Sequence, residues 1–181
     1  MNRFRPDPAV WSGNVTHDGL PNVASTFGNK IIPAWTWDRL AEAAARQRLP
    51  WIAKGILTAE AAHAALGAGA SAILVSNHGG RQVDPAPASL DALPEVAAAV
   101  AGRVPVLLDS GVRTGADVFL ALALGATAVV IGRLAVYGLA AAAEDGVRRT
   151  IELLTDELRT LMVLAGVPDI ASLSPDMVMK A

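Results

Sequence analysis

The feature that most constrains the fold of this chain is a pattern that occurs twice, with a spacing of about 55 residues. Residues 49–62, LPWIAKGILTAEAA, resemble residues 104–117, VPVLLDSGVRTGAD, and residues 69–77 resemble residues 125–133. In each copy, short apolar runs alternate with alanine-rich segments of helical length. Repeated right-handed βα units form either an open doubly wound sheet or a barrel. An α/β fold with a parallel sheet is therefore expected.

Four apolar runs are predicted to be the strands of this sheet. None alternates between apolar and polar residues, which is typical of parallel strands that are covered on both faces. Thr58 and Thr114 each precede a helical segment with an acidic residue in its first turn, Glu60 or Asp117, which suits N-capping and the helix dipole. The predicted strands are Trp51–Ala53, Ala72–Val75, Val106–Leu108 and Ala128–Ile131.

Other segments lie before and after the repeated part. Residues 1–33 contain many prolines and glycines without an apolar period, so they are predicted to form an extended loop or arm. Thr36 is expected to cap a helix that has Trp37, Leu40, Ala41 and Ala44 on one face. Toward the C-terminus, a helical stripe is expected to dock on the outside of the sheet; it comprises Val147, Ile151, Leu154, Leu158, Leu161 and Ala165.

Composition limits the functions open to the chain. Its 181 residues suit one domain but are few for a closed eight-stranded barrel, which usually needs about 250. With 52% apolar and 18% charged residues it is globular, and a net charge of -2 predicts no binding to nucleic acid or anionic membrane. The absence of cysteine excludes disulfides and thiolate metal sites, and the three histidines suggest no metal site. Without an apolar leader or a stretch long enough to span a bilayer, a soluble cytoplasmic protein is expected.

Polar groups and glycines follow each predicted strand. They include Lys54, the segment SNHGGRQ at 76–82, the segment DSGVR at 109–113, and Gly132 with Arg133. In parallel α/β folds, ligands bind at the carboxyl ends of the strands, so these groups are expected to meet at one rim. Alternatively, Lys54 is a solvated loop lysine, and Asp109 only caps a turn. His17 and His63 have no such partners nearby in sequence and are interpreted as structural or solvated.

These residues resemble a known family. SNHGGRQ is similar to the active-site signature of the FMN-dependent 2-hydroxy acid oxidases and dehydrogenases, which include glycolate oxidase, lactate oxidase, mandelate dehydrogenase and flavocytochrome lactate dehydrogenase. The resemblance extends over residues 49–62, 105–126 and 132–140, and so covers nearly everything from Thr36 to about Gly166. NRFR and LPNV in the arm resemble the mobile segment that follows strand four in this family, and the hydroxymandelate-oxidase-like branch is the most similar.

The resemblance implies a role for each of these residues. His78 would be the base that takes a proton from a small 2-hydroxy acid substrate, and Arg81 would bind the substrate carboxylate as a bidentate partner. Lys54 would act in catalysis by stabilising negative charge on the reduced flavin. The residues expected to bind FMN are Lys54, Ser76, Asp109, Ser110, Gly111, Val112, Arg113, Gly132 and Arg133.

The chain also departs from the family pattern. Ser110 stands where the family usually has a second glycine, and Thr114 where a second arginine is frequent. Strands one to four, which supply the other wall of the flavin pocket, have no counterpart in residues 1–33. The chain is therefore interpreted as a partial TIM (β/α)8 barrel: residues 34–181 are the C-terminal half, strands five to eight with their helices, and residues 1–33 are the preceding arm.

Two functional hypotheses follow from this half barrel. In the first, the chain is an FMN-dependent enzyme that oxidises an L-2-hydroxy acid to the 2-oxo acid, completed by an N-terminal half or by homo-oligomerisation. In the second, it is a truncated, catalytically inactive half-barrel fragment or a phosphate-binding module that needs a partner half. Another type of FMN barrel, such as an isomerase, does not explain His78 and Arg81 together. Unpaired sheet edges and uncovered apolar faces are expected to drive association.

Overall fold

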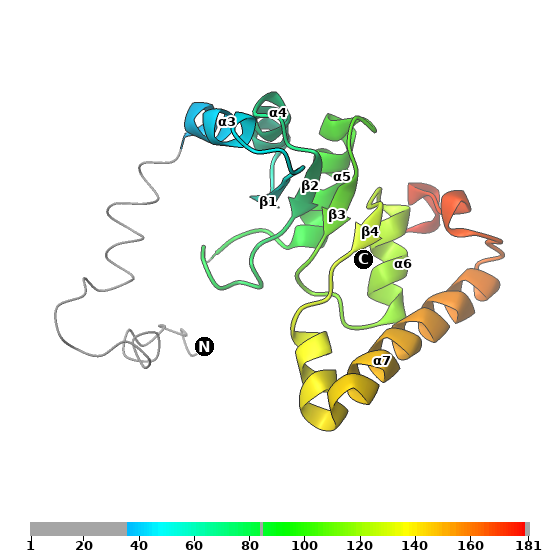
Figure 1. The fold of residues 1–181 in the computed structure, drawn as a ribbon. Coiled ribbons are helices and arrows are strands. Elements are labelled where there is room, and N and C mark those ends of the chain that lie inside the picture. The colour runs from blue at the N-terminus through cyan, green and yellow to red at the C-terminus, as the bar shows by residue number, and fades with distance from the viewer. Residues whose placement is uncertain (1–35, 84, 180–181) are drawn as a thin grey trace, which may run out of the picture. The chain divides into compact units, whose positions relative to one another are not determined.

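The computed structural model describes residues 36–83 and 85–179 (Figure 1). The chain forms two compact units, Met1–Arg46 and Gln47–Ala181. In the first unit, the described part is helix α3 (Trp37–Ala45) with its N-cap Thr36, whose hydroxyl oxygen accepts a hydrogen bond from the N–H of Arg39 at 3.3 Å. The helix predicted after Thr36 is thus confirmed. The arm predicted for residues 1–33 lies outside the described residues.

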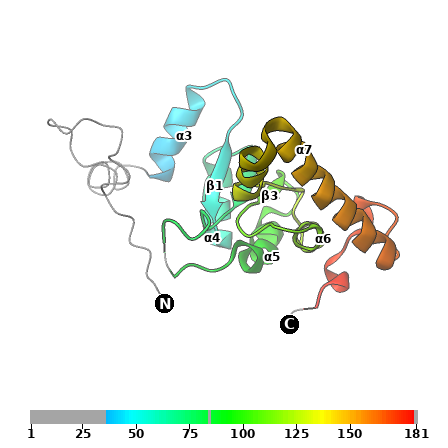
Figure 2. The ribbon, with the colours of Figure 1, turned by 90° about the horizontal axis from the view of Figure 1, so that it is seen from below.

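The second unit contains a four-stranded parallel sheet in the order β1-β2-β3-β4. Its strands are β1 (Ile52–Ile56), β2 (Ala72–Val75), β3 (Val106–Leu108) and β4 (Ala128–Val129). Helices α4 (Ala59–Gly67), α5 (Ser89–Val100) and α6 (Gly115–Ala123) connect successive strands (Figure 1). Figure 2 shows these three helices along one side of β1 and β3. Because spatial order follows chain order, every βα unit adds its strand to the same edge. The predicted α/β fold is confirmed.

Two predicted strand boundaries were wrong. Strand β1 does not stop before Lys54 but continues to Ile56, with an irregularity in its register between these two residues. Gly55 in between has φ +91°, a left-handed conformation that favours glycine and lets the strand resume beyond the bulge. Strand β4 ends at Val129 rather than Ile131, although the N–H of Val130 still donates to the carbonyl of Leu108 at 2.8 Å.

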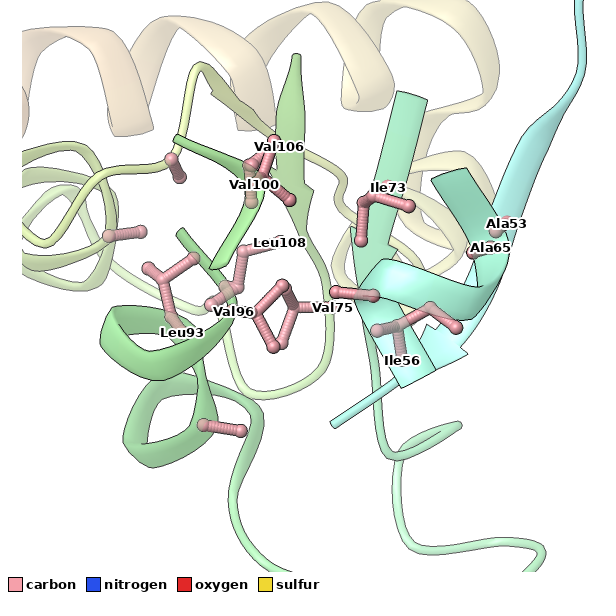
Figure 3. Close-up of a cluster of buried hydrophobic side chains, with 14 of the residues drawn as sticks. Ala53, Ile56, Ala65, Ile73, Val75, Leu93, Val96, Val100, Val106 and Leu108 are labelled. Atoms are coloured by element: carbon pink, nitrogen blue, oxygen red, sulfur yellow. The ribbon is translucent and has the colours of Figure 1, made fainter. Parts of the chain in front are cut away.

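The two faces of the sheet differ in what covers them. One face packs against α4, α5 and α6 in a cluster that includes Ile73, Val75, Leu93, Val96 and Leu108 (Figure 3). On the other face the register aligns Lys54 with Leu74, Leu74 with Leu107, and Leu107 with Ala128. Ile52 and Val130, at opposite edges of the sheet, remain 52% and 39% exposed. Lys54 therefore lies on the face of the sheet opposite α4, α5 and α6.

The two copies of the sequence repeat stabilise the N-termini of their helices in the same way. The hydroxyl of Thr58 caps α4 and that of Thr114 caps α6, where Asp117 completes a capping box. In addition, the first N–H of α4 donates to the carboxylate of Glu95 at 2.7 Å, and the first N–H of α6 donates to that of Glu157 at 2.6 Å. Each repeat thus binds the N-terminus of its helix with a carboxylate from the following helix. The predicted N-caps are confirmed.

Helix α7 (Arg133–Leu164) follows β4 and is kinked at Ala142 and Ala143, which have non-helical dihedral angles. It packs against α6, but the stripe predicted for this surface is only partly covered, since Ile151 is 52% exposed. Two short 3-10 helices follow, η3 (Ile170–Ser172) and η4 (Pro175–Met177). None of the helices in the described part of the chain is both long and apolar enough to cross a membrane.

The kink of α7 contains a strained residue. Ala143 has φ +47° and ψ −129°, a conformation that is essentially restricted to glycine. Close by, Gly138 and Gly146 approach so closely that a Cβ on Gly146 would lie 1.9 Å from the carbonyl oxygen of Gly138. Glycine is thus required on both sides of the kink, whereas alanine occupies the kink itself.

We predict that Ala143→Gly stabilises the protein by about 1 kcal/mol. Relief of strain, about 1–3 kcal/mol, exceeds the conformational entropy that glycine adds to the unfolded chain, about 0.5–1 kcal/mol. Urea denaturation measures this difference. Ala140→Gly, in the regular part of α7, is the matched control and is expected to lose about 1 kcal/mol. Equal destabilisation by the two substitutions would contradict the assignment of strain to Ala143.

Candidate functional site

The loop after β2 adopts a conformation that explains its glycines. His78, Gly79 and Gly80 follow one another with φ of +57°, +68° and +73°. Three successive left-handed residues turn the chain sharply, and glycine permits this at two of the three positions. Asn77 supports the turn, because its side-chain oxygen accepts from the N–H of Gly79 at 3.0 Å and its amide nitrogen donates to the carbonyl of Pro87 at 3.3 Å. No role for Asn77 was predicted from the sequence.

Polar groups from within β1 and from the residues that follow β2 and β3 form one hydrogen-bonded set, which we call the polar ring. The ammonium of Lys54 donates to the hydroxyl of Ser76 at 2.7 Å and forms a short ion pair with Asp109. The hydroxyl of Ser110 donates to the other carboxylate oxygen of Asp109 at 2.8 Å. The ring closes through the loop, whose N–H groups at 78 and 79 donate to Ser76 and Ser110, each at 3.0 Å.

The sequence repeat explains how the ion pair arises. Lys54 and Asp109 occupy the same position in the two copies, each after the apolar residues of its strand. Because β2 lies between β1 and β3, the two side chains reach each other across the end of β2, next to the fully buried Ser76. Lys54 thus lies within β1 rather than in a loop, and it is paired with Asp109 and Ser76, while 42% of its side chain remains exposed to solvent.

The environment of His78 favours its neutral form. Burial lowers the pKa of the imidazole, and the positive charges of Lys54 and Arg81 lower it further, while the negative charge of Asp109 acts in the opposite direction. The net result is a pKa below the ordinary value of 6.5. At neutral pH His78 therefore has an unprotonated nitrogen that can accept a proton.

Asp109 is held as a carboxylate. Partial burial alone would raise its pKa, but the hydrogen bonds from Lys54, Ser76 and Ser110 and the charge of Lys54 lower the pKa below its ordinary value. The ring therefore contains a stable negative charge beside the lysine ammonium. Among the groups at the polar ring, His78 is therefore the one whose protonation state changes nearest to neutral pH.

Two close contacts place neighbouring groups against the loop. A Cβ added to Gly55 would lie 2.7 Å from Cε1 of His78, so the imidazole lies directly against the bulge of β1. A Cβ added to Gly79 would lie 3.0 Å from a terminal nitrogen of Arg133, which places that guanidinium beside the loop. Arg81 is exposed, and its Nε donates to the carbonyl of His78 at 2.9 Å. Gly55 was predicted to follow the first strand together with Lys54, but its contact with His78 was not predicted, although a glycine inside a strand indicates such an approach.

The remaining predicted residues lie along the β3–α6 loop and at the start of α7. Val112 is buried, and the N–H of Arg113 donates to Asp117 at 2.9 Å, so that N–H is not available to a ligand. Arg113 makes no hydrogen bond to the polar ring within the described residues. By contrast, Gly111 and Gly132 face open space, since a Cβ on either would meet nothing within 4 Å.

Gly132 is also the N-cap of α7, and no side chain caps that terminus. A phosphate could bind here, because hydrogen-bond donors are available from three sources. These are the accessible backbone at Gly111 and Gly132, the N–H groups at the N-terminus of α7, and the exposed guanidinium of Arg133. Together with the ammonium of Lys54, this donor set fits a cofactor such as FMN that carries both a phosphate and an electron-accepting ring.

Comparison with known proteins gives the family. The model of the FMN-dependent dehydrogenases matches residues 4–180. The chain belongs to the FMN-dependent dehydrogenase family. Among curated relatives, it is 50% identical over 142 residues to 2-hydroxyacid oxidase 2 of Mus musculus, covering 78% of this chain and 40% of that protein. It is 46% identical over 158 residues to 4-hydroxymandelate oxidase of Amycolatopsis orientalis, covering 86% and 44%.

Solved structures of mandelate oxidases contain the same arrangement of strands and helices in part of their chains. A mandelate oxidase with benzoyl-formic acid matches this chain with a TM-score of 0.72 and 48% identity, over 76% of this chain and 41% of that one. The four parallel strands and their helices thus match part of a TIM barrel. The chain spans about two fifths of the length of the curated relatives it matches.

We predict that Gly55→Ala displaces the imidazole of His78. The added methyl group meets the ring, and φ of +91° is unfavourable for alanine, so a loss of about 1–3 kcal/mol in stability is expected. A changed His78 resonance in the NMR spectrum and a lower unfolding midpoint would report both effects. Gly67→Ala is the matched control, because its methyl group meets nothing within 4 Å at the end of α4 and should gain up to about 1 kcal/mol. A His78 resonance that is unchanged in the first variant would sink the prediction.

Proposed function

We propose that the chain forms the FMN-binding C-terminal half of a 2-hydroxy acid oxidase or dehydrogenase, strands five to eight of its barrel, with residues 1–33 as the preceding arm. The reaction is oxidation of an L-2-hydroxy acid to the 2-oxo acid. The observation that carries the proposal is the polar ring, in which Lys54 of β1 meets Ser76 and Asp109 at the carboxyl ends of β2 and β3, beside His78. Ligands of parallel α/β folds bind at this end of the sheet.

Binding of FMN is assigned to the groups around the ring. Lys54 is proposed to stabilise negative charge on the flavin, with Ser76 and Asp109 beside it. The backbone of residues 110–112, with Arg113, Gly132 and Arg133, is proposed to bind the ribityl chain and the phosphate. Bound FMN supplies the two-electron acceptor that oxidation of the substrate carbon requires.

His78 and Arg81 are proposed to act on the substrate. The neutral imidazole accepts the proton that leaves the 2-hydroxy acid, and its lowered pKa keeps it in the base form at neutral pH. Arg81 is exposed and can turn its guanidinium to a carboxylate, which it would bind through two parallel hydrogen bonds. These two roles together require a hydroxyl group next to a carboxylate.

The names of relatives support this substrate class. An L-lactate oxidase of Nostoc is 49% identical to this chain over 154 residues, and solved mandelate oxidases match it with bound (S)-4-hydroxymandelic acid or benzoyl-formic acid. Lactate and mandelate both have a hydroxyl on the carbon next to the carboxylate. We therefore propose that the substrate is a 2-hydroxy acid, the class that this shared group defines.

A cytoplasmic location, without nucleic acid or membrane partners, stays a further prediction.

A second candidate function rests on the face of the sheet opposite α4, α5 and α6. Ile52 and Val130 stay exposed there, at the two edges of the four-stranded sheet. In this candidate, the described residues bind phosphate but do not react until an N-terminal half or a second copy covers that face. The two candidates differ in whether the chain by itself is reduced by a 2-hydroxy acid when loaded with FMN.

We predict that His78→Gln strongly slows reduction of the flavin without abolishing its binding. The experiment adds FMN to the purified full chain, follows flavin fluorescence, and then records bleaching by (S)-mandelate or L-lactate without oxygen. It is repeated with a separately expressed N-terminal half of a relative. Loss of the base is expected to slow bleaching by about 10²- to 10⁴-fold.

His63→Gln is the matched control, because His63 lies on α4 and contacts Arg103 rather than the polar ring. Bleaching of the His78→Gln protein at the rate of the unchanged chain would rule out the base assignment. Binding of FMN with no bleaching unless the N-terminal half is added would favour the second candidate.

We also predict the pH dependence of the reduction. Because burial and the charges of Lys54 and Arg81 lower the pKa of His78, the rate should fall only as the pH drops below 6.5. Asp109→Asn removes a charge that raises this pKa, so the acid limb of the profile should move to lower pH. Rate profiles of the two proteins under anaerobic conditions measure the shift. Movement of the limb to higher pH in the variant would contradict the proposed electrostatics.

A further inference from the structure

Ser110 has a backbone conformation that a serine rarely adopts. It lies two residues beyond β3 with φ +74°, inside the left-handed region. A residue with a Cβ is strained there, whereas glycine is not. The side chain must therefore contribute something that offsets the strain.

The hydroxyl of Ser110 makes two hydrogen bonds. It donates to the carboxylate of Asp109 at 2.8 Å and accepts from the N–H of Gly79 at 3.0 Å. Among the described hydrogen bonds, the second one joins the left-handed turn at residues 78–80 to the end of β3. The other acceptor of the Gly79 N–H is Asn77, which belongs to the same loop and cannot tie it to the sheet.

We infer that Ser110 is a positioning residue whose hydroxyl fixes the turn carrying His78, and so holds the imidazole against Gly55 at the polar ring. Its importance for catalysis rests on the proposed function, but the positioning itself is a property of the chain without cofactor. Ser110 was predicted to bind FMN; in this inference its side chain acts on the protein, because both of its hydrogen bonds have protein partners.

The surroundings of the turn determine what its release would do. Lys54 from β1, Asp109 from the end of β3 and Arg81 from the loop are the charges that act on His78, and burial acts with them. The guanidinium of Arg133 from α7 lies against Gly79. If the turn is no longer tied to β3, the imidazole gains solvent, and the pKa that burial had lowered should rise toward its ordinary value.

Two substitutions separate the hydroxyl from the backbone. Ser110→Ala removes the hydroxyl and keeps the strained conformation, whereas Ser110→Gly removes the hydroxyl and relieves the strain. If the hydroxyl positions the turn, both variants lose the tie to Gly79. If only the backbone conformation matters, Ser110→Gly behaves like the unchanged protein.

The test uses the full chain without FMN and two NMR measurements, the exchange rate of the Gly79 amide and the pH titration of His78. In both variants we expect exchange of that amide to be about fivefold faster, the change that corresponds to one lost hydrogen bond of about 1 kcal/mol, and the pKa of His78 to rise. His63 serves as an internal reference in the same spectra.

Ser172→Gly is the matched control, since its hydroxyl also donates to an aspartate, Asp169, at 2.8 Å, but in η3 away from the polar ring. It should change neither measurement. Unchanged exchange and titration in both Ser110 variants, or a change in Ser110→Ala alone, would overturn the inference. Failure of the chain to bind FMN would count against the proposed function and leave these two measurements valid.

Discussion

The ion pair between Lys54 and Asp109 is the interaction on which the candidate site depends. It connects the first and third strands across the end of the second, so it is possible only while the sheet holds these strands in order and in register. The pair is partly exposed, and screening by water keeps its contribution to stability small. Its effect is mainly geometric, because it fixes a cation, an anion and two hydroxyl groups around the turn that carries His78.

Much of the fold followed from the sequence because apolar runs and helix caps are local signals. The run Ala72–Val75 is buried at every residue, and Thr58 and Thr114 cap the helices where the sequence placed them. The boundary of β1 could not be predicted in this way, since a bulge at Gly55 lets the strand pass a polar lysine. Likewise, the kink of α7 lies at Ala142 and Ala143, where alanine gives no helix-breaking signal, and it brings Gly138 and Gly146 into contact.

Within the site, sequence reasoning found the residues better than their partners. It brought Lys54, Ser76, His78 and Asp109 to one rim by assuming adjacent parallel strands, and the structure has them within one hydrogen-bonded set. It did not foresee that Ser110 faces Gly79 and Asp109, because a side chain at positive φ points where ordinary geometry would not send it. Their roles toward cofactor and substrate remain predictions.

The carboxylates that bind the helix N-termini come later in the sequence than the N–H groups they accept from. Glu95 lies 36 residues after the N–H group that it accepts from, and Glu157 lies 42 residues after its own partner. During synthesis on a ribosome, the N-terminus of α4 therefore lacks the Glu95 carboxylate until α5 has emerged. In the same way, the N-terminus of α6 lacks the Glu157 carboxylate until that part of α7 has emerged. The last hydrogen bond at each of these helix N-termini can therefore form only after the following helix has been synthesised.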